Sequence, residues 1–364
     1  MIHSVILKTS FVKFITKGGR KTGLLAGRLF LLAAVLLAAA WQPPASAAAA
    51  PLWAADASVS LPGGTTEILM GENFTFSAVF ENTSAEVGYG PFIDLIFPVT
   101  GKDGAGTEVD DGIDFISATY LGVNLVRVVQ TFPDDGGGTG CVDHPYAVDN
   151  TGAPVQVCGT AGDKLVTLQM PFGSLVPAQP DLVATINAKL SDLADVGVGN
   201  DLLIRARGGY QFGNDELDNP ASDPSILDGW DDWYIRPTIL RLTKAYIGPE
   251  DETATGPNFP RRYRLTVDIA DTQTLTDLDI TDVLPINMQY LSVISTTIRG
   301  VSTTTTDIST PGAATPGGTL TRRFASVTGT TAANDAEMIF EYFIPLRDLN
   351  GDNVIPPDNG DDRR

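Results

Sequence analysis

Histidine and cysteine are scarce in this chain, whose 364 residues include only 2 of each. Zinc clusters and most histidine-based catalysis need more such residues than this. Basic residues are also few: 24 Lys and Arg stand against 44 Asp and Glu, for a formal net charge of −20. A phosphate backbone must be met by a basic patch, so the composition argues against nucleic acid as a partner.

Motifs for a known reaction are missing as well. No G-x-S-x-G nucleophile elbow occurs, and no glycine-rich phosphate-binding motif follows a strand and opens a helix. The 44 acids supply many carboxylate pairs, but no pattern singles out two of them for glycoside hydrolysis. We therefore expect no enzymatic activity and assign no catalytic residue, while an acidic-site glycosidase stays open as a distant alternative.

The first 47 residues contain no acid and have the pattern of a targeting segment. Basic residues precede the apolar run Leu29–Trp41, which is short for a membrane span but normal for a signal-peptide core. Gln42-Pro43-Pro44 ends any helix, and Ala45-Ser46-Ala47 offers the small residues that a signal peptidase reads. We expect a cleaved signal peptide at 1–47, with a retained N-terminal anchor as the alternative. The mature chain would be secreted or on the cell surface and would meet a membrane only through this precursor segment.

Cleavage would make the chain more acidic. The lost segment carries six basic residues, which leaves 18 bases against 44 acids and a net charge of −26. In an exported chain, Cys141 and Cys158 meet an oxidising compartment, so we expect them to form a disulfide that closes a loop over Val142–Val157. The alternative, a nucleophilic cysteine near His144, leaves the second thiol unexplained.

Nearly every patterned segment alternates apolar and polar residues with the period of a β-strand. In 74–80 and again in 263–269, four apolar or aromatic residues share one face. Further strands are expected at 91–98, 113–121, 123–132, 165–172, 182–190, 202–212, 239–247, 275–284, 288–295, 320–327 and 338–344. The one helix candidate, 190–196, is too short to set a fold. Many short strands with Gly, Pro, Asn and Asp between them predict an all-β sandwich or barrel.

An internal repeat favours two related domains over one large sandwich. One copy spans 71–76, 91–98 and 113–118, and the other spans 262–267, 278–285 and 288–293. Each copy has an alternating strand, a strand that ends in an apolar residue and proline, and an aromatic-apolar-Ser strand. We expect a first β-sandwich at 53–236 with the disulfide loop and an acidic stretch, a second at 237–347, and a polar tail at 348–364.

The second copy also carries a family resemblance. Leu242-Thr243-Lys244, Tyr263-Arg264-Leu265-Thr266-Val267 and Ile280-Thr281-Asp282-Val283-Leu284-Pro285, followed by Tyr290-Leu291-Ser292, resemble the conserved repeat (domain of unknown function eleven) of bacterial surface proteins. The resemblance covers about 238–295 well, but Ala270-Asp271-Thr272-Gln273 stands where the family has an Asn-rich turn. It implies an immunoglobulin-like sandwich in a large exported or surface-attached protein, and it implies no catalytic residues. Together with the internal repeat, it leads us to expect an all-β fold of two tandem immunoglobulin-like sandwiches.

Two acidic segments are candidates for calcium, which takes oxygens from carboxylates and carbonyls. The first has Asp215, Glu216, Asp218 and Asp223, and its alternative is a solvated loop. The second has Asp348, Asn350 and Asp352 in the D-x-N-x-D opening of an EF-hand-like loop, although Pro356-Pro357 blocks an exiting helix. No other cofactor is expected.

Aromatic residues beside the first acidic segment offer a different site. Trp230, Trp233 and Tyr234 could stack on a sugar. The alternative is that the aromatic rings only pack the acidic loop against the sandwich. Lys244 suggests an intramolecular isopeptide bond, which needs a buried lysine beside an asparagine and an acid. The last strand offers Glu341 but no Asn, so we expect a solvent-facing lysine instead.

Together these observations predict an exported, non-enzymatic structural or adhesive surface module with an unknown surface or matrix partner. The alternative is a calcium-dependent or carbohydrate-binding extracellular module. Because the sequence stops at Arg364, just after the second sandwich, we also hypothesise that it is the N-terminal part of a longer repeat protein.

Overall fold

The computed structural model describes residues 55–103, 110–215, 224–249, 255–309 and 315–354. These residues form strands and turns but no helix, which confirms the predicted all-β class. The helix candidate at 190–196 is wrong, since Leu190 ends a strand and the following residues form turns and loop. No described helix is long and apolar enough to cross a membrane. The expected signal peptide lies outside the described residues.

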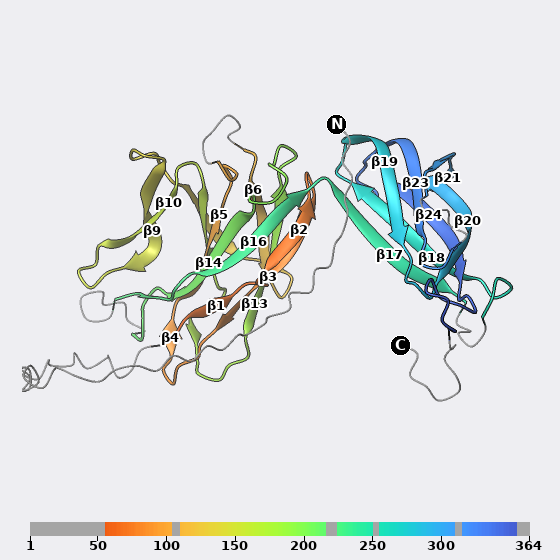
Figure 1. Cartoon of the computed structure of the whole chain (residues 1–364). Helices are drawn as coiled ribbons and strands as arrows, with labels where there is room; N and C mark the ends of the chain where they lie inside the picture. Colours follow the sequence, from red (N-terminus) through yellow and green to blue (C-terminus); the bar gives the residue numbers. More distant parts are fainter. Residues whose placement is uncertain (1–54, 104–109, 216–223, 250–254, 310–314, 355–364) are drawn as a thin grey trace, which may run out of the picture. The chain divides into compact units, whose positions relative to one another are not determined.

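The first sandwich has two main sheets, which we call the β3 sheet and the β5 sheet (Figure 1). The β3 sheet has the order β1 (Ser58–Ser60), β3 (Asn73–Glu81), β13 (Leu182–Leu190), β6 (Ile113–Tyr120) and β7 (Val123–Asn124). The β5 sheet has the order β2 (Thr65–Leu69), β16 (Asp231–Thr238), β14 (Leu202–Tyr210), β5 (Pro91–Phe97), β11 (Lys164–Gln169) and β8 (Val126–Thr131), and β15 (Ile226–Leu227) pairs with β14. The short strands β4 (Gly88–Tyr89) and β12 (Ser174–Leu175) pair with each other.

Alternation along β3 creates the core between these two sheets. Phe74, Phe76 and Phe80 are buried, while the residues between them are more exposed. The ring of Phe76 lies 6.3 Å from that of Phe97 on β5 and 5.0 Å from that of Trp233 on β16. Aromatic contacts of this kind join the two sheets face to face, as expected for a sandwich.

The second sandwich is built from the remaining strands. One sheet has the order β17 (Leu240–Gly248), β18 (Arg261–Ile269), β24 (Ala336–Phe343), β20 (Gln289–Ile298) and β21 (Val301–Ser302). The other has the order β19 (Thr274–Val283), β23 (Thr319–Thr328) and β22 (Thr306–Asp307). Val267, Phe324 and Phe340 belong to a buried cluster that contains residues from both sheets, separate from the core of the first sandwich.

The two sandwiches share one topology, which bears out the repeat seen in the sequence. The order β1-β3-β13-β6-β7 in the first corresponds to β17-β18-β24-β20-β21 in the second, and β5-β11-β8 corresponds to β19-β23-β22. The three sequence segments of each copy occupy equivalent strands: β3, β5 and β6 in one, and β18, β19 and β20 in the other. The predicted fold class, two tandem immunoglobulin-like β-sandwiches, is therefore confirmed as two related sandwiches.

The first sandwich is the larger because it carries additions. β14, β16 and β2 extend the β5 sheet beyond β5, and β16 runs past residue 236, where we expected the domain to end. A separate two-stranded hairpin, β9 (Thr139–Val148) and β10 (Pro154–Thr160), lies in the chain between β8 and β11. This hairpin contains the two cysteines and the one described histidine.

Candidate functional site

The disulfide expected from the sequence is present. Cys141 on β9 and Cys158 on β10 are bonded and occupy directly opposite positions of the antiparallel pair. The segment between them, predicted as a loop, is instead the β9–β10 hairpin itself, and only the turn at 149–153 lacks strand structure. The cross-link therefore staples two strands that already pair through their backbones.

The hairpin packs on the outer face of the β5 sheet. A small cluster of buried residues there is separate from the sandwich core and consists of Ile96, Phe132, Val157 and Leu165, with Val142 and Trp230 against it. Gly159 on β10 permits a close contact, because a Cβ at this position would lie 2.4 Å from the ring of Phe132. Every residue of β5 is buried as a result, since one face meets the sandwich core and the other meets the hairpin.

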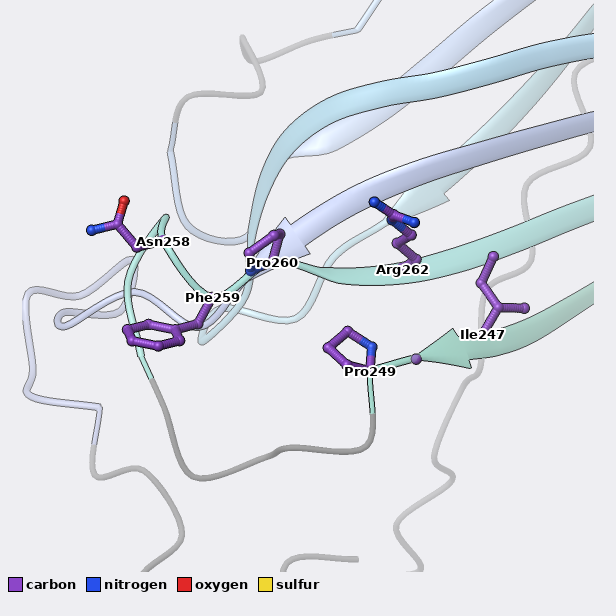
Figure 2. Close-up of a pocket in the computed structure, with 7 residues that line it drawn as sticks. Ile247, Pro249, Asn258, Phe259, Pro260 and Arg262 are labelled. Atoms are coloured by element: carbon purple, nitrogen blue, oxygen red, sulfur yellow. The ribbon is translucent and has the colours of Figure 1, made fainter.

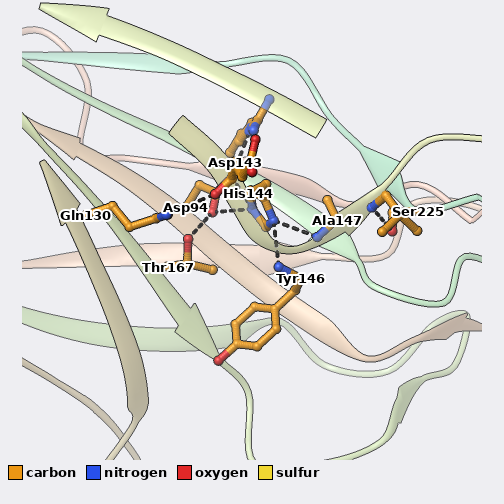
Figure 3. A network of polar contacts seen from close by, with 10 residues as sticks. Asp94, Gln130, Asp143, His144, Tyr146, Ala147, Thr167 and Ser225 are labelled. Atoms are coloured by element: carbon orange, nitrogen blue, oxygen red, sulfur yellow. Dashed lines mark hydrogen bonds and ion pairs between the residues drawn. The ribbon is translucent and has the colours of Figure 1, made fainter. Parts of the chain in front are cut away.

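A buried polar network lies under the hairpin next to this cluster (Figure 3). Its centre is Asp94 on β5, which has no exposed surface. One carboxylate oxygen of Asp94 accepts hydrogen bonds from Nε2 of His144 at 2.9 Å and from the hydroxyl of Thr167 at 2.8 Å. The other oxygen accepts from Nε of Arg207 at 2.9 Å and lies 3.0 Å from the same histidine nitrogen. Asp94 thus ties β5 to β9, β11 and β14.

The histidine of this network has both ring nitrogens engaged. Its Nδ1 accepts the backbone N–H groups of Tyr146, at 3.0 Å, and Ala147, at 2.6 Å. A nitrogen that accepts two donors carries no proton, so the imidazole is the tautomer with its proton on Nε2. The side chain is fully buried and its ring lies 4.8 Å from that of Phe92. His144 therefore positions the hairpin and has no free nitrogen to offer a substrate.

Arg207 connects the network to an aromatic ring, that of Trp230. Its guanidinium lies 4.4 Å from the centre of the Trp230 ring, and that of Arg205 lies 5.4 Å from it. These are cation–π contacts. Trp230 consequently joins the apolar cluster under the hairpin to the cations of β14.

The three aromatic candidates do not form one sugar-stacking platform. Trp233 is only 3% exposed and packs in the sandwich core, so the prediction that it stacks on a sugar is wrong. Tyr234 follows it directly on β16 and, because successive strand residues point to opposite faces, lies on the outer face with 39% of its surface exposed. Trp230 is covered in part by the two arginines.

The first calcium candidate is mostly outside the described residues. Of its four acids, only Asp215 is described, and its backbone N–H bonds the carbonyl of Phe212. Glu216, Asp218 and Asp223 lie in 216–223, of which the structure describes nothing. Within the described part of the chain, no group of three or more His, Cys, Asp and Glu side chains could hold a metal ion.

The second calcium candidate forms a turn after the second sandwich. Oδ1 of Asp348 accepts the backbone N–H groups of Asn350 and Asp352, both at 2.9 Å. The carbonyl of Asp348 accepts the N–H of Gly351, and a β-bridge joins Arg347 to Asn353. The Asp348 carboxylate therefore caps its own turn, as aspartate commonly does.

Lys244 has a partner that the sequence did not suggest. Its Nζ lies 2.7 Å from one carboxylate oxygen of Asp282 on β19 and 4.3 Å from the centre of the Tyr263 ring. The lysine side chain is 37% exposed. This ion pair links the two sheets of the second sandwich, and Glu341 is paired with Arg262 instead.

A shallow pocket lies where β17 ends (Figure 2). Its volume is about 560 Å³, and its lining includes Ile247, Pro249, Phe259, Pro260 and Arg262. The one charged group on it, the guanidinium of Arg262, is 2.8 Å from the carboxylate of Glu341. The described lining of the pocket thus presents apolar surface and a cation that is paired with Glu341.

Comparison of this chain with family models and with curated proteins found no match. The conserved-repeat resemblance therefore stays a prediction.

Several solved structures align with it at low similarity. The macrocyclisation enzyme AvmM of alchivemycin A biosynthesis has 13% identity and a TM-score of 0.28 over 54% of this chain and 91% of its own. The Bacillus cereus major pilin subunit BcpA has 8% identity and a TM-score of 0.24 over 84% and 64%. The N-terminal region of an enterococcal surface protein has 10% identity and a TM-score of 0.25 over 82% of this chain and 85% of its own. At such TM-scores these likenesses support no conclusion about fold or function.

Proposed function

We propose that this chain is an exported, non-enzymatic structural or adhesive module of a cell surface, with a surface or matrix molecule as its partner. One observation carries the proposal. A hairpin cross-linked by a disulfide is held on the outer face of the first sandwich by a buried polar network centred on Asp94. Disulfides form and persist in oxidising compartments, which supports a secreted or surface location. A hairpin fixed in this way presents a rigid surface at low entropic cost for binding.

The non-enzymatic part of the proposal rests on how the titratable groups are used. His144 is buried with both ring nitrogens hydrogen-bonded, and Asp94 accepts hydrogen bonds from three side chains. The described pocket at the end of β17 has its single cation paired with Glu341. These groups stabilise the fold, whereas a catalytic group must reach a substrate.

Location and adhesion are tested separately. Intact producing cells are treated with a membrane-impermeant biotin reagent, and the chain is expected among the labelled proteins; recovery only after lysis would contradict export. Beads coated with the purified chain are then passed over surfaces coated with extracellular matrix or with cell envelopes. Greater retention than with albumin-coated beads is expected, and equal retention on every surface would remove the adhesive half of the proposal.

A hairpin variant identifies the presenting surface. The double variant Cys141→Ser/Cys158→Ser keeps the sequence of the hairpin turn but loses the staple. If the rigid hairpin is the adhesive element, beads coated with this variant are retained less, while a variant of the exposed second-sandwich residue Leu346→Ser is retained like the parent chain.

A further inference from the structure

The free edge of β8 differs from the other sheet edges in the described residues. An unpaired strand edge is a template for another strand, and proteins protect such edges by shortness, charge or bulges. Six edge strands, β1, β4, β7, β12, β21 and β22, have only two or three residues each. β2 carries Glu67, β19 carries three aspartates, and β17 has Lys244 and a register shift near Gly248. In the hairpin, β9 carries Asp143, and β10 has Pro154 and a register shift beside it. β8 has six residues, an unbroken register with β11, no proline and no acid, and its one charge is Arg127.

The internal repeat supplies a direct comparison. β22 is the equivalent of β8 in the second sandwich, but it is only two residues long, and its Asp307 lies 2.8 Å from Arg322. The same edge is thus two residues long with an acid in one copy, and six residues long without an acid in the other. On β8, Val126 is 62% exposed and Val129 is 46% exposed, and Leu121 and Val123 just before it are more exposed still.

The distribution of charge favours a second copy of the chain as the partner of the β8 edge. The chain has a formal net charge of −20, so most approaches of two copies bring acids together. The sequence between Asp114 and Asp134 contains no acid, and its single charge is Arg127, which lies 5.5 Å from the centre of the Phe115 ring. The β8 strands of two copies therefore bring no carboxylate to a shared edge.

We propose that the β8 edge binds the β8 edge of a second copy of this chain, antiparallel, so that the β5 sheets of two copies become one continuous sheet. A two-fold axis perpendicular to the sheet places Val129 opposite Val129 of the second copy. Arg127 then faces Thr131, so no like charges are directly opposed. The dimer goes beyond the function proposed above and does not depend on it.

The test is the oligomeric state of the full chain, measured by sedimentation equilibrium over a range of concentrations and salt. A concentration-dependent dimer is expected, and added salt is expected to strengthen it because salt screens the net negative charge of both copies. Val129→Glu places two carboxylates at the symmetric edge, and we expect it to weaken dimerisation by about tenfold or more. The matched control is Val183→Glu, since Val183 is 44% exposed but lies on the central strand β13.

The outcomes separate clearly. Loss of the dimer in Val129→Glu, with a dimer retained in Val183→Glu, supports the β8 interface. A chain that stays monomeric throughout, or a dimer that both variants form as the parent does, overturns it. If Val129→Glu fails to fold by circular dichroism, the more exposed Val126→Glu replaces it. A parent chain bearing Val129→Cys is expected to form an intermolecular disulfide under oxidation, whereas Val183→Cys is not.

Discussion

Asp94 and His144 lie fifty residues apart in the sequence and face each other at 2.9 Å, completely buried, between the β5 sheet and the hairpin. The same carboxylate holds Arg207 and Thr167, so one side chain joins four strands. The consequences of this contact and of three other features can be measured.

Removal of the central carboxylate should strongly destabilise the first sandwich. Asp94→Leu leaves the buried Arg207 without its counter-charge and His144 without an acceptor, and breaking a buried ion pair in this way costs about 3–5 kcal/mol in the free energy of unfolding. The control is Asp114→Leu, which removes the exposed pair with Lys164 and should cost less than about 1 kcal/mol. Urea titrations of both variants measure the difference, and equal losses would contradict the structural role of Asp94.

Loss of the disulfide should act mainly on the hairpin. Cys141 and Cys158 are separated by 17 residues, and the loop-entropy model assigns about 3 kcal/mol to a cross-link of this size. Hydrogen exchange of residues 139–160 should therefore rise in the double serine variant, while exchange in β3 and β13 should change little. Uniformly faster exchange throughout the first sandwich would mean that the staple supports the core and not the hairpin alone.

Asp163 should make stability depend on pH in the direction opposite to most acids. Burial is the largest cause of its shift and raises the pKa of its carboxyl group above 3.8, although hydrogen bonds from Thr100 oppose the shift. Its folded state binds the proton more tightly than its unfolded state. Its contribution to stability is therefore present at low pH and is lost as pH rises above about 4 through the folded pKa.

Asp163→Asn tests this sign. The amide keeps an oxygen for Thr100 but carries no charge to bury. Relative to the parent chain, we expect a higher free energy of unfolding at about pH 7 and no gain at about pH 3. Chemical denaturation at the two pH values measures the change, and a gain of equal size at both would show that ionisation of Asp163 is not its cause.

Calcium should leave the turn at Asp348 unchanged. The carboxylate already accepts the N–H groups of Asn350 and Asp352, so the turn is closed by the chain's own hydrogen bonds. We expect the melting temperature of the full chain to be the same in calcium and in chelator. A rise with calcium that Asp348→Ala abolishes would assign an ion to this turn, whereas a rise that this variant keeps would direct attention to the acids at 215–223.

Alternating patterns in the sequence located the core strands well. The segment predicted at 182–190 coincides with β13, and that at 74–80 lies within β3, because each buries one face and exposes the other. Period-2 burial leaves a direct trace in the residue pattern. The cysteine pair was also predictable, since two thiols commonly pair in the oxidising compartment that the sequence led us to expect.

The strands that the sequence hid are those without such a pattern. β9 contains Gly140, Asp143 and Pro145, which are residue types typical of turns, and it packs against a sheet whose strands lie elsewhere in the sequence. β16 begins with two aspartates and contains Pro237. Trp233 and Tyr234 could not be told apart without its register, since a shift of one residue exchanges the buried and the exposed ring.

The buried polar network left little local signal in the sequence. Asp94 sits in an otherwise apolar strand, and its partners lie 50, 73 and 113 residues away. A single acid in the middle of a buried strand was the only indication, because such a group needs a partner that the neighbouring sequence does not supply.

The hairpin contributes no residue to the core between the two main sheets of the first sandwich. It enters the chain between β8 and β11, and the corresponding connection in the second sandwich, from β22 to β23, contains no strand among its described residues. The hairpin is therefore a graft on a repeated scaffold, with its own small core, its own polar anchor and its own cross-link. Its turn at 149–153 is a natural position at which to insert a foreign epitope for display.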